Sequence, residues 1–259
     1  MIHNPFHLLN NLKRKAAHLL LTLTSGRGGQ CGTQNLTNRE AWLEHTLANI
    51  PSGQRILDAG AGELRYKQFC AHLDYVSQDF AQYDGQGDTK GLQTGKWDQS
   101  KLDVVSDITN IPELSESFDA VMCIEVLEHL SDPIRALREL TRLIRPRGTL
   151  IIAAPFCSLT HFAPYFYHTG YSRYFYEYWL GELGFEIEDM QWNGNFFEYL
   201  AQELLRLPWV GEKYASMRMT LLEQNAINIV VGLLNRLSQN NNGSEQLLAY
   251  GLHIRARKR

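Results

Sequence analysis

Three side chains that can act as acids, bases or metal ligands stand close together in the segment MCIEVLEHLSDP. Glu125, Glu128 and His129 fall at positions i, i+3 and i+4, so they share one face if a helix begins at Glu125. Two carboxylates and an imidazole in this arrangement can bind a divalent cation. Alternatively, His129 can act as a general base toward a substrate hydroxyl or amine, oriented by a glutamate. A third interpretation is purely structural, because a helix N-terminus attracts acidic side chains on electrostatic grounds alone.

A second chemical signal is the glycine-rich loop in the segment ILDAGAGEL, which follows a short apolar run. In open parallel sheets, ligands bind beyond the carboxyl ends of the strands, where glycine lets the backbone approach them. A dinucleotide-binding loop would need glycine at the position of Arg65, and Asp58 would repel a pyrophosphate. An acidic strand end instead favours a cofactor with a positive centre and an ammonium group, such as S-adenosylmethionine.

The elements that must position these residues alternate between short apolar strands and amphipathic helices. Five strands fall between about residues 37 and 190, and the segment FEIEDMQWN makes a sixth. The segment QLLAYGLHIRARK alternates apolar and polar residues, which predicts a seventh strand at an edge of the sheet. Strands that are apolar on both faces indicate a parallel sheet covered by helices on both sides. We therefore expect an α/β fold: a Rossmann-like, seven-stranded, mostly parallel sheet with helices on both faces.

Two segments lie outside this alternating pattern. Residues 1–36 are expected to form an N-terminal arm or lid, and residues 37–259 the main domain. An amphipathic helical insertion, at about residues 196–245, precedes the last strand. It could cap a pocket, pair with a second subunit to form a homodimer, or rest on a membrane surface. Its apolar face favours the first two.

Several segments, in order along the chain, resemble the motifs of class I S-adenosylmethionine-dependent methyltransferases. They are LDAGAG, YVSQDF, VVSDITNIP and SFDAVMCIEVLEHLSDP followed by LRELTRLIRPRGTLIIAAP, and they extend the resemblance over residues 40–190. Arg147 stands where the family commonly has glycine. The resemblance implies that Asp79 holds the two ribose hydroxyls, and that Asp107 meets the adenine amino group with Ile108 against the ring. The other cofactor-binding residues that it implies are Asp58, Gly60, Gly62 and Glu125.

The Glu-x-x-Glu-His pattern is also similar to the metal site of small-RNA 2′-O-methyltransferases and ubiquinone-pathway O-methyltransferases. In these families the cation binds the hydroxyl that will be methylated and favours its deprotonation. The similarity implies a divalent metal site made by Glu125, Glu128, His129 and His161. In the absence of metal, His129 and His161 are the candidate catalytic residues.

The segment FCSLTHFAPYFYHTGYSRYFYEYWL is crowded with aromatic residues. Phe162, Tyr165 and Tyr167 follow the fifth strand, where the resembling families build the wall of the substrate site. Arg173 could receive an anionic group of the substrate. Tyr174 and Tyr178 stand at near-helical spacing and are expected in the core.

The composition of the chain limits the choice of function. Its net charge of −3 and isoelectric point near 6.3 make nucleic acid an unlikely partner. The four cysteines form no Cys-x-x-Cys pair, and the apolar runs are too short to cross a bilayer, so we expect a cytoplasmic protein with free thiols.

The resemblance then implies methyl transfer to a small or medium acceptor, most often at oxygen, with S-adenosylhomocysteine as product. The expected setting is secondary, cell-surface or quinone-type metabolism. The alternatives are a metal-dependent RNA-end O-methyltransferase and a non-catalytic, methyltransferase-like binding subunit.

Overall fold

The computed structural model describes residues 31–259, and these form two compact units. The sheet unit comprises residues 35–195 and 245–259, and the helical unit comprises residues 196–244 with residues 31–34. Most of the arm expected over residues 1–36 therefore lies outside the described residues. None of the described helices is long and apolar enough to cross a membrane.

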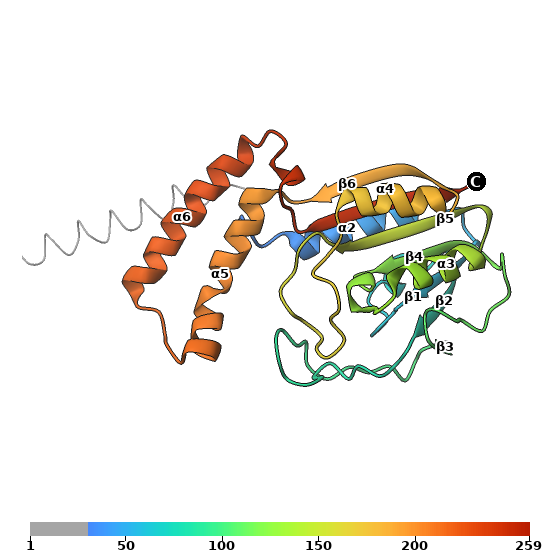
Figure 1. The fold of residues 1–259 in the computed structure, drawn as a ribbon, viewed down its shortest axis with the longest axis horizontal. Coiled ribbons are helices and arrows are strands. Elements are labelled where there is room, and N and C mark those ends of the chain that lie inside the picture. Colours follow the sequence, from blue (N-terminus) through green and yellow to red (C-terminus); the bar gives the residue numbers. More distant parts are fainter. Residues whose placement is uncertain (1–30) are drawn as a thin grey trace, which may run out of the picture. The chain divides into compact units, whose positions relative to one another are not determined.

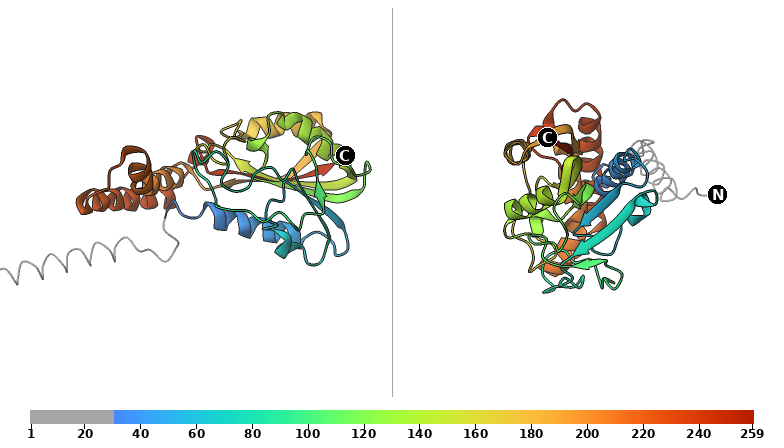
Figure 2. Two further views of the ribbon diagram at one scale, coloured as in Figure 1. Left: turned by 90° about the horizontal axis from the view of Figure 1, so that it is seen from below. Right: turned by 90° about the vertical axis from the view of Figure 1, so that its right-hand side faces the viewer.

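The sheet unit is built on one seven-stranded sheet in the order β3-β2-β1-β4-β5-β7-β6 (Figures 1 and 2). The first five strands run parallel, and β7 is antiparallel to both of its neighbours. The predicted fold class is thus confirmed. The strands are β1 (Arg55–Ala59), β2 (Asp74–Asp79), β3 (Val104–Val105), β4 (Phe118–Ile124), β5 (Ile144–Pro155), β6 (Phe185–Asn193) and β7 (Gly251–Lys258).

Helices cover both faces of the sheet because successive strand residues point to opposite sides. Leu57, Val121 and Ile152 belong to one apolar cluster with residues of α3 (Pro133–Leu143) and α4 (Arg173–Glu182). Their neighbours in sequence, such as Ile56, Met122 and Ile151, pack with α2 (Asn35–Ala48) on the other face. Buried runs such as AVMCI in β4 are apolar at every position for this reason, as the sequence indicated.

The last strand differs from its prediction. β7 is not an edge strand, because it pairs with β5 on one side and with β6 on the other. Its first four residues are buried, so the apolar–polar alternation of its sequence does not mark a solvent-exposed face. His253 is one of these buried residues and stacks on Trp42 with ring centroids 4.7 Å apart.

Two smaller predictions also need correction. The apolar residues of the segment ELRYKQFCAHL recur at helical spacing, which predicts a helix, but the segment forms only a 3₁₀ turn, Lys67–Cys70. In α4, Tyr174 and Tyr178 are 70% and 60% exposed, and the core position between them is taken by the fully buried Tyr176. By contrast, the segment DPIRALRELTRLI predicts a helix with Pro133 in its first turn, and α3 does begin there. The side chain of Asp132 accepts a hydrogen bond from the Arg135 amide.

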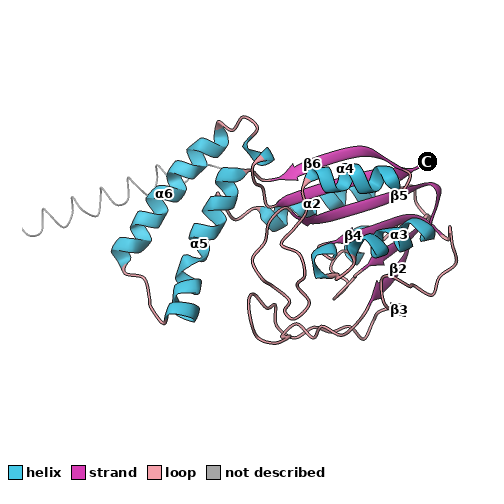
Figure 3. Cartoon of the chain, viewed as in Figure 1, coloured by secondary structure: helices cyan, strands magenta, loops and turns pink. Residues whose placement is uncertain are grey.

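The helical unit consists of α5 (Phe196–Ala215) and α6 (Leu221–Gln239), which fill most of the predicted insertion. Its core is small and is made by Cys31, Ala201, Ile227, Val231 and Leu234. The four cysteines of the chain are free in the structure, as expected. Figure 3 shows that the chain between β2 and β3 is a long loop without helix or strand.

Candidate active site

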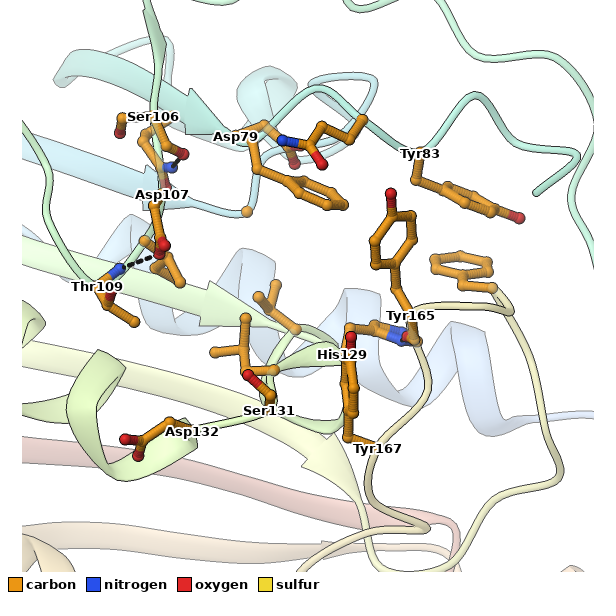
Figure 4. Close-up of a pocket in the computed structure, with 18 of the residues that line it drawn as sticks. Asp79, Tyr83, Ser106, Asp107, Thr109, His129, Ser131, Asp132, Tyr165 and Tyr167 are labelled. Carbon is orange, nitrogen blue, oxygen red and sulfur yellow. Dashed lines mark hydrogen bonds between the residues drawn. The ribbon is translucent and has the colours of Figure 1, made fainter. Parts of the chain in front are cut away.

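A cavity of about 610 Å³ lies at the carboxyl ends of the parallel strands. It is lined by residues that follow β1, β2, β3, β4 and β5 in turn. Figure 4 shows Asp79 and Asp107 on one side of it and His129 and Tyr165 on another. Most of the predicted site residues therefore come together at one edge of the sheet; those that line the cavity are Gly60, Asp79, Asp107, Ile108, Glu125, His129, Phe162, Tyr165 and Tyr167.

The glycine-rich loop turns tightly at Gly60, which has a φ of +83°. A Cβ atom at this residue would lie 2.4 Å from Cγ2 of Val126, so no larger side chain fits. The loop is held by hydrogen bonds from the amides of Gly60 and Ala61 to the carbonyl oxygen of Gln78. Glycine at this position thus lets the loop pack closely against Val126 while Gly60 lines the cavity.

Asp79 ends β2 and fixes the loop from the other side. One carboxylate oxygen accepts a hydrogen bond from the Gly62 amide at 2.9 Å, and the other accepts from the Ala81 amide at 2.9 Å. The side chain lines the cavity although the residue is only 5% exposed. Nε2 of Gln99 also donates to Oδ1 at 3.4 Å, whereas Oδ2 keeps a lone pair, so Asp79 can still accept a hydrogen bond from a ligand hydroxyl.

Asp107 and Ile108 lie after β3. Asp107 is exposed, and its Oδ1 accepts a hydrogen bond from the Thr109 amide at 2.8 Å. Ile108 is buried and lines the cavity. The pair offers an acceptor for an amino group beside a flat apolar surface, which suits a purine ring.

Asp58 does not line the cavity, in contrast to its predicted role. It is 1% exposed, and it accepts a hydrogen bond from the Tyr75 hydroxyl at 2.7 Å. Burial raises the pKa of Asp58 to about 7, although the bond from Tyr75 opposes this rise. In this structure the Asp58 side chain is therefore buried near the end of β1 and bonds to Tyr75 of β2 instead of facing the cavity.

Glu125 was expected to share a helical face with Glu128 and His129, and this expectation was wrong. Its φ of +57° is incompatible with a right-handed helix, which is limited here to a 3₁₀ turn at Leu127–His129. Its carboxylate forms an ion pair with Arg39 of α2, with 2.7 Å between Oε2 and Nη1. Glu125 thus lines the cavity without joining the other two side chains.

Glu128, His129 and His161 do come together. Nε2 of each imidazole lies 3.7 Å from Oε1 of Glu128, and the three possible ligand atoms lie within 4.8 Å of one another. Glu128 is completely buried, and neither of its carboxylate oxygens has a hydrogen-bond partner among the described residues.

Both imidazole rings are oriented by the backbone. Nδ1 of His129 donates to the carbonyl oxygen of Tyr165 at 2.6 Å, and Nδ1 of His161 donates to that of Leu159 at 2.8 Å. A ring that donates through Nδ1 presents the lone pair of Nε2 when it is neutral. Metal-binding histidines are commonly held in this way, so the donor set of Glu128 and the two histidines fits a divalent cation.

The pKa values of the three side chains in this cluster shift in different directions. Burial opposes the ionisation of Glu128, but the nearby His161 and His129 outweigh it and lower the pKa of that carboxyl. Burial lowers the pKa of His129. Burial also tends to lower the pKa of His161, but the negative charge of Glu128 at 3.7 Å and the hydrogen bond to the Leu159 carbonyl outweigh it and raise that pKa. The cluster therefore combines an ionised glutamate with a neutral His129 that faces the cavity.

Five aromatic rings form a wall of the cavity, which we call the aromatic wall: Phe80, Tyr83, Trp97, Phe162 and Tyr165. The ring of Phe162 stacks on those of Tyr83 and His129, at centroid distances of 4.7 and 4.8 Å. Trp97 meets the edge of Phe162 at 5.3 Å.

The loop after β2 contributes three of these rings and was not predicted to take part. It is tied to the loop after β5 by hydrogen bonds between the backbones of Leu92 and Thr160, and of Phe162 and Leu92. The aromatic residues of its glycine- and aspartate-rich sequence were the available signal. Arg173, by contrast, lies outside the cavity, is 40% exposed and pairs with Glu177 on the surface of α4.

Comparisons with known proteins agree with this geometry. Residues 57–152 match the model of a methyltransferase domain family. A demethylmenaquinone methyltransferase from Renibacterium salmoninarum is 35% identical over 39% of this chain and 41% of its own length. A ubiquinone biosynthesis O-methyltransferase from Xanthomonas axonopodis is 31% identical over 43% of this chain and 47% of its own length. The chain thus spans less than half the length of each of these curated relatives.

The fold is shared more widely than the sequence. The crystal structure of an S-adenosylmethionine-dependent methyltransferase from Archaeoglobus fulgidus superposes with a TM-score of 0.53 over 86% of this chain and 94% of that one, at 16% identity. At this identity the likeness concerns the fold alone. Together, the sheet order, the glycine-rich loop and the family match place a methyltransferase domain in the sheet unit, over residues 57–152 of this chain.

Proposed function

We propose that this protein transfers a methyl group from S-adenosylmethionine to a hydroxyl oxygen of a small or medium, flat acceptor. The observation that carries the choice of oxygen is the cluster of Glu128, His129 and His161 beside the aromatic wall. A buried carboxylate and an imidazole that is kept neutral are suited to accepting the proton of a hydroxyl. The quinone-pathway relatives support an acceptor of this kind.

In this proposal the cofactor lies along the glycine-rich loop. S-adenosylmethionine supplies a methyl group on a sulfonium that is already activated for displacement. Asp79 accepts a hydrogen bond from a ribose hydroxyl, and Asp107 and Ile108 hold the adenine. Gly60 keeps the backbone close enough to contact the ligand, while Glu125 adds negative charge at the same edge.

The aromatic wall positions the acceptor and excludes water from it. Phe162 and Tyr165 offer flat surfaces on which a ring can stack. Their loop is held by backbone hydrogen bonds to Leu92, so the surface is formed before the ligand arrives. Such preorganisation lets the enzyme align the hydroxyl oxygen with the methyl carbon.

His129 takes the proton. Its Nδ1 is occupied by the Tyr165 carbonyl, so Nε2 is the basic atom, and its lowered pKa keeps it neutral at physiological pH. The acceptor oxygen bonds to the methyl carbon as the carbon–sulfur bond breaks, and the hydroxyl proton passes to Nε2. Glu128 then stabilises the imidazolium across 3.7 Å.

In a second form of this proposal, His129 does not take the proton. Instead, Glu128, His129 and His161 would together hold a divalent cation. It would act as a Lewis acid that lowers the pKa of the acceptor hydroxyl. Nε2 of both histidines and the carboxylate of Glu128 are the atoms that would bind it. Metal dependence is therefore part of the test.

The first experiment titrates the full chain with S-adenosylmethionine in a calorimeter. We expect Asp79→Asn to weaken binding by at least about tenfold, because the negative charge and one of the two acceptor oxygens of the side chain are lost. Asp88→Asn is the matched control, since Asp88 lies in an exposed loop outside the cavity. Equal affinity of the wild type and Asp79→Asn would contradict the cofactor site, and absence of any binding would contradict the proposed function.

The second experiment screens catechols, demethylated quinone precursors and ribonucleosides for a mass gain of one methyl group. With the acceptor found, His129→Gln should reduce kcat by about 10²–10⁴-fold, the range for loss of general-base chemistry. Glu177→Gln on the surface of α4 is the control. Full activity in a chelator supports His129 as the base. Activity that is lost in chelator and restored by one divalent metal supports the cation, and unchanged activity of His129→Gln excludes both roles.

A further inference from the structure

Residues 97–99, in the long loop between β2 and β3, lie against the glycine-rich loop. The amide of Asp98 donates a hydrogen bond to Oε1 of Glu63, which belongs to the glycine-rich loop, at 3.1 Å. Nε2 of Gln99 donates to Oδ1 of Asp79, at the end of β2, at 3.4 Å. Residues 97–99 are therefore attached to both of the segments that are proposed to hold the cofactor.

The indole of Trp97 packs directly on Gly62. Apart from residues 61–63, the three heavy atoms nearest to the position that a Cβ atom of Gly62 would take all belong to this indole. The closest two, Cζ3 and Cη2, lie 3.1 and 3.3 Å from that position, so a larger side chain at residue 62 would displace the indole. Glycine at this residue thus allows Trp97 to cover the glycine-rich loop.

Hydrogen bonds hold Trp97 in this place. Its amide donates to the carbonyl oxygen of Asp84 at 2.9 Å, and Nε1 of its indole donates to Oγ1 of Thr94 at 2.8 Å. The carbonyl oxygen of Gly85 accepts hydrogen bonds from the amides of Thr94 and Gly95, which ties the two arms of the loop together. Both N–H groups of Trp97 therefore have partners within its own loop, and its position does not depend on a ligand.

Trp97 also faces the cavity. Its side chain lines the cavity and is only partly buried. Edge contacts at centroid distances of 5.0 Å to Tyr83 and 5.3 Å to Phe162 place it where the aromatic wall meets the glycine-rich loop. With the indole in its lining, the cavity still has a volume of about 610 Å³, which is in the range of small-molecule sites. A ligand in this space would remove the exposed part of the ring from water.

The neighbours of Trp97 indicate which part of the cofactor this ring meets. Gly62, on which the indole packs, donates its amide hydrogen to Oδ2 of Asp79 at 2.9 Å. Asp79 is the residue proposed to bind the ribose. Figure 4 shows Asp79 and Tyr83, the edge partner of Trp97, on the same side of the cavity. Trp97, Gly62 and Asp79 therefore converge on one place.

We propose that Trp97 is a further cofactor-binding residue, whose indole packs against the nucleoside of S-adenosylmethionine at its ribose. The ring offers an apolar surface to the C–H groups of the sugar, while Asp79 accepts a hydrogen bond from one of its hydroxyls. The loop between β2 and β3 is then part of the cofactor site, and Trp97 separates the cofactor from the acceptor. This inference rests on the proposed binding of the cofactor along the glycine-rich loop.

The first experiment titrates the full chain in a calorimeter with S-adenosylmethionine and with 5′-methylthioadenosine, which has the nucleoside of the cofactor without its amino-acid end. We expect Trp97→Ala to weaken the binding of both ligands by the same factor, at least about tenfold, because both lose the same apolar contact. Trp209→Ala is the matched control, since Trp209 is 43% exposed, lies in the helical unit and does not line the cavity. It should bind both ligands as the wild type does.

A second variant separates the contact from any loosening of the loop in Trp97→Ala. Trp97→Phe keeps an apolar ring on Gly62 and should bind S-adenosylmethionine within about threefold of the wild type. The cofactor should change the tryptophan fluorescence of the wild type and of Trp209→Phe, because it lies against the Trp97 indole. Trp97→Phe should show no such change, since the other four tryptophans do not line the cavity.

Three results would overturn the inference and leave the proposed function intact. The first is equal affinity of Trp97→Ala and wild type for S-adenosylmethionine. The second is weaker binding of S-adenosylmethionine with unchanged binding of 5′-methylthioadenosine, which would place the ring against the amino-acid end. The third is a fluorescence change that persists in Trp97→Phe. If the wild type binds neither ligand, the proposed function fails, and this inference fails with it.

Discussion

Glu125 illustrates how one backbone conformation changes what a sequence motif can do. Spacing alone placed it beside Glu128 and His129, because the i, i+3 and i+4 positions of a helix coincide on one face. At a φ of +57° the chain instead turns its carboxylate toward Arg39. His161 is distant in sequence, yet it completes the cluster with Glu128 and His129. The motif thus retains three of its four predicted ligands.

Asp58 gives the residue-scale prediction on pH. Its pKa of about 7 in the folded chain exceeds the value of about 3.9 expected in the unfolded chain, so the folded state binds the extra proton. Stability from this group is therefore present at low pH and is lost as the pH rises from about 4 to about 7, by on the order of 4 kcal/mol. Asp58→Asn keeps an acceptor for Tyr75 and cannot ionise.

We expect Asp58→Asn to be more stable than wild type at pH about 8, with a smaller difference at pH about 5. Urea unfolding of the sheet unit in the full chain measures both values. Asp88→Asn, in an exposed loop, should differ from wild type by the same amount at the two pH values. A difference for Asp58→Asn that does not grow with pH would show that Asp58 is ionised in the apoprotein.

At the scale of elements, the loop after β1 depends on Gly60. Gly60→Ala should weaken S-adenosylmethionine binding by about tenfold or more, because the new methyl group would overlap Val126 and displace the loop. Gly53→Ala is a matched control: Gly53 has a φ of +80°, but nothing lies within 4 Å of its Cβ position. Both variants carry the strain of alanine at positive φ. If Gly60→Ala loses more affinity for S-adenosylmethionine than Gly53→Ala, the difference therefore comes from the contact with Val126. Equal affinities in the two variants would contradict this account.

The elements also show what local sequence could and could not predict. Apolar runs such as β4, and the Asp132–Pro133 start of α3, are encoded locally, and both were predicted. The order of the last two strands is not encoded in this way, because β7 is placed by pairing with β5, about a hundred residues earlier in the chain. The aromatic wall was missed for the same reason, since Tyr83 and Trp97 reach the cavity through a loop whose path depends on Leu92.

At the scale of the whole molecule, the described chain forms two compact units with different surface features. Every residue that lines the cavity belongs to the sheet unit, and most of the exposed apolar surface belongs to the helical unit. Among the described residues, the core cluster of the helical unit has only five buried members, so we expect this unit to be less stable than the sheet unit. A ligand stabilises only the part of a protein that binds it.

We therefore expect S-adenosylmethionine to protect the two units unequally. At about 100 times its Kd the cofactor adds about 2.7 kcal/mol to the sheet unit, which raises the Tm of that unit by roughly 5–10 °C. Calorimetry should show this shift in one transition and an unchanged, weaker transition at lower temperature. Hydrogen exchange should slow in β1, β2 and β4, while α5 and α6 exchange quickly with or without cofactor. A single transition that moves as a whole, with equal protection of α6, would mean that the helical unit is energetically coupled to cofactor binding.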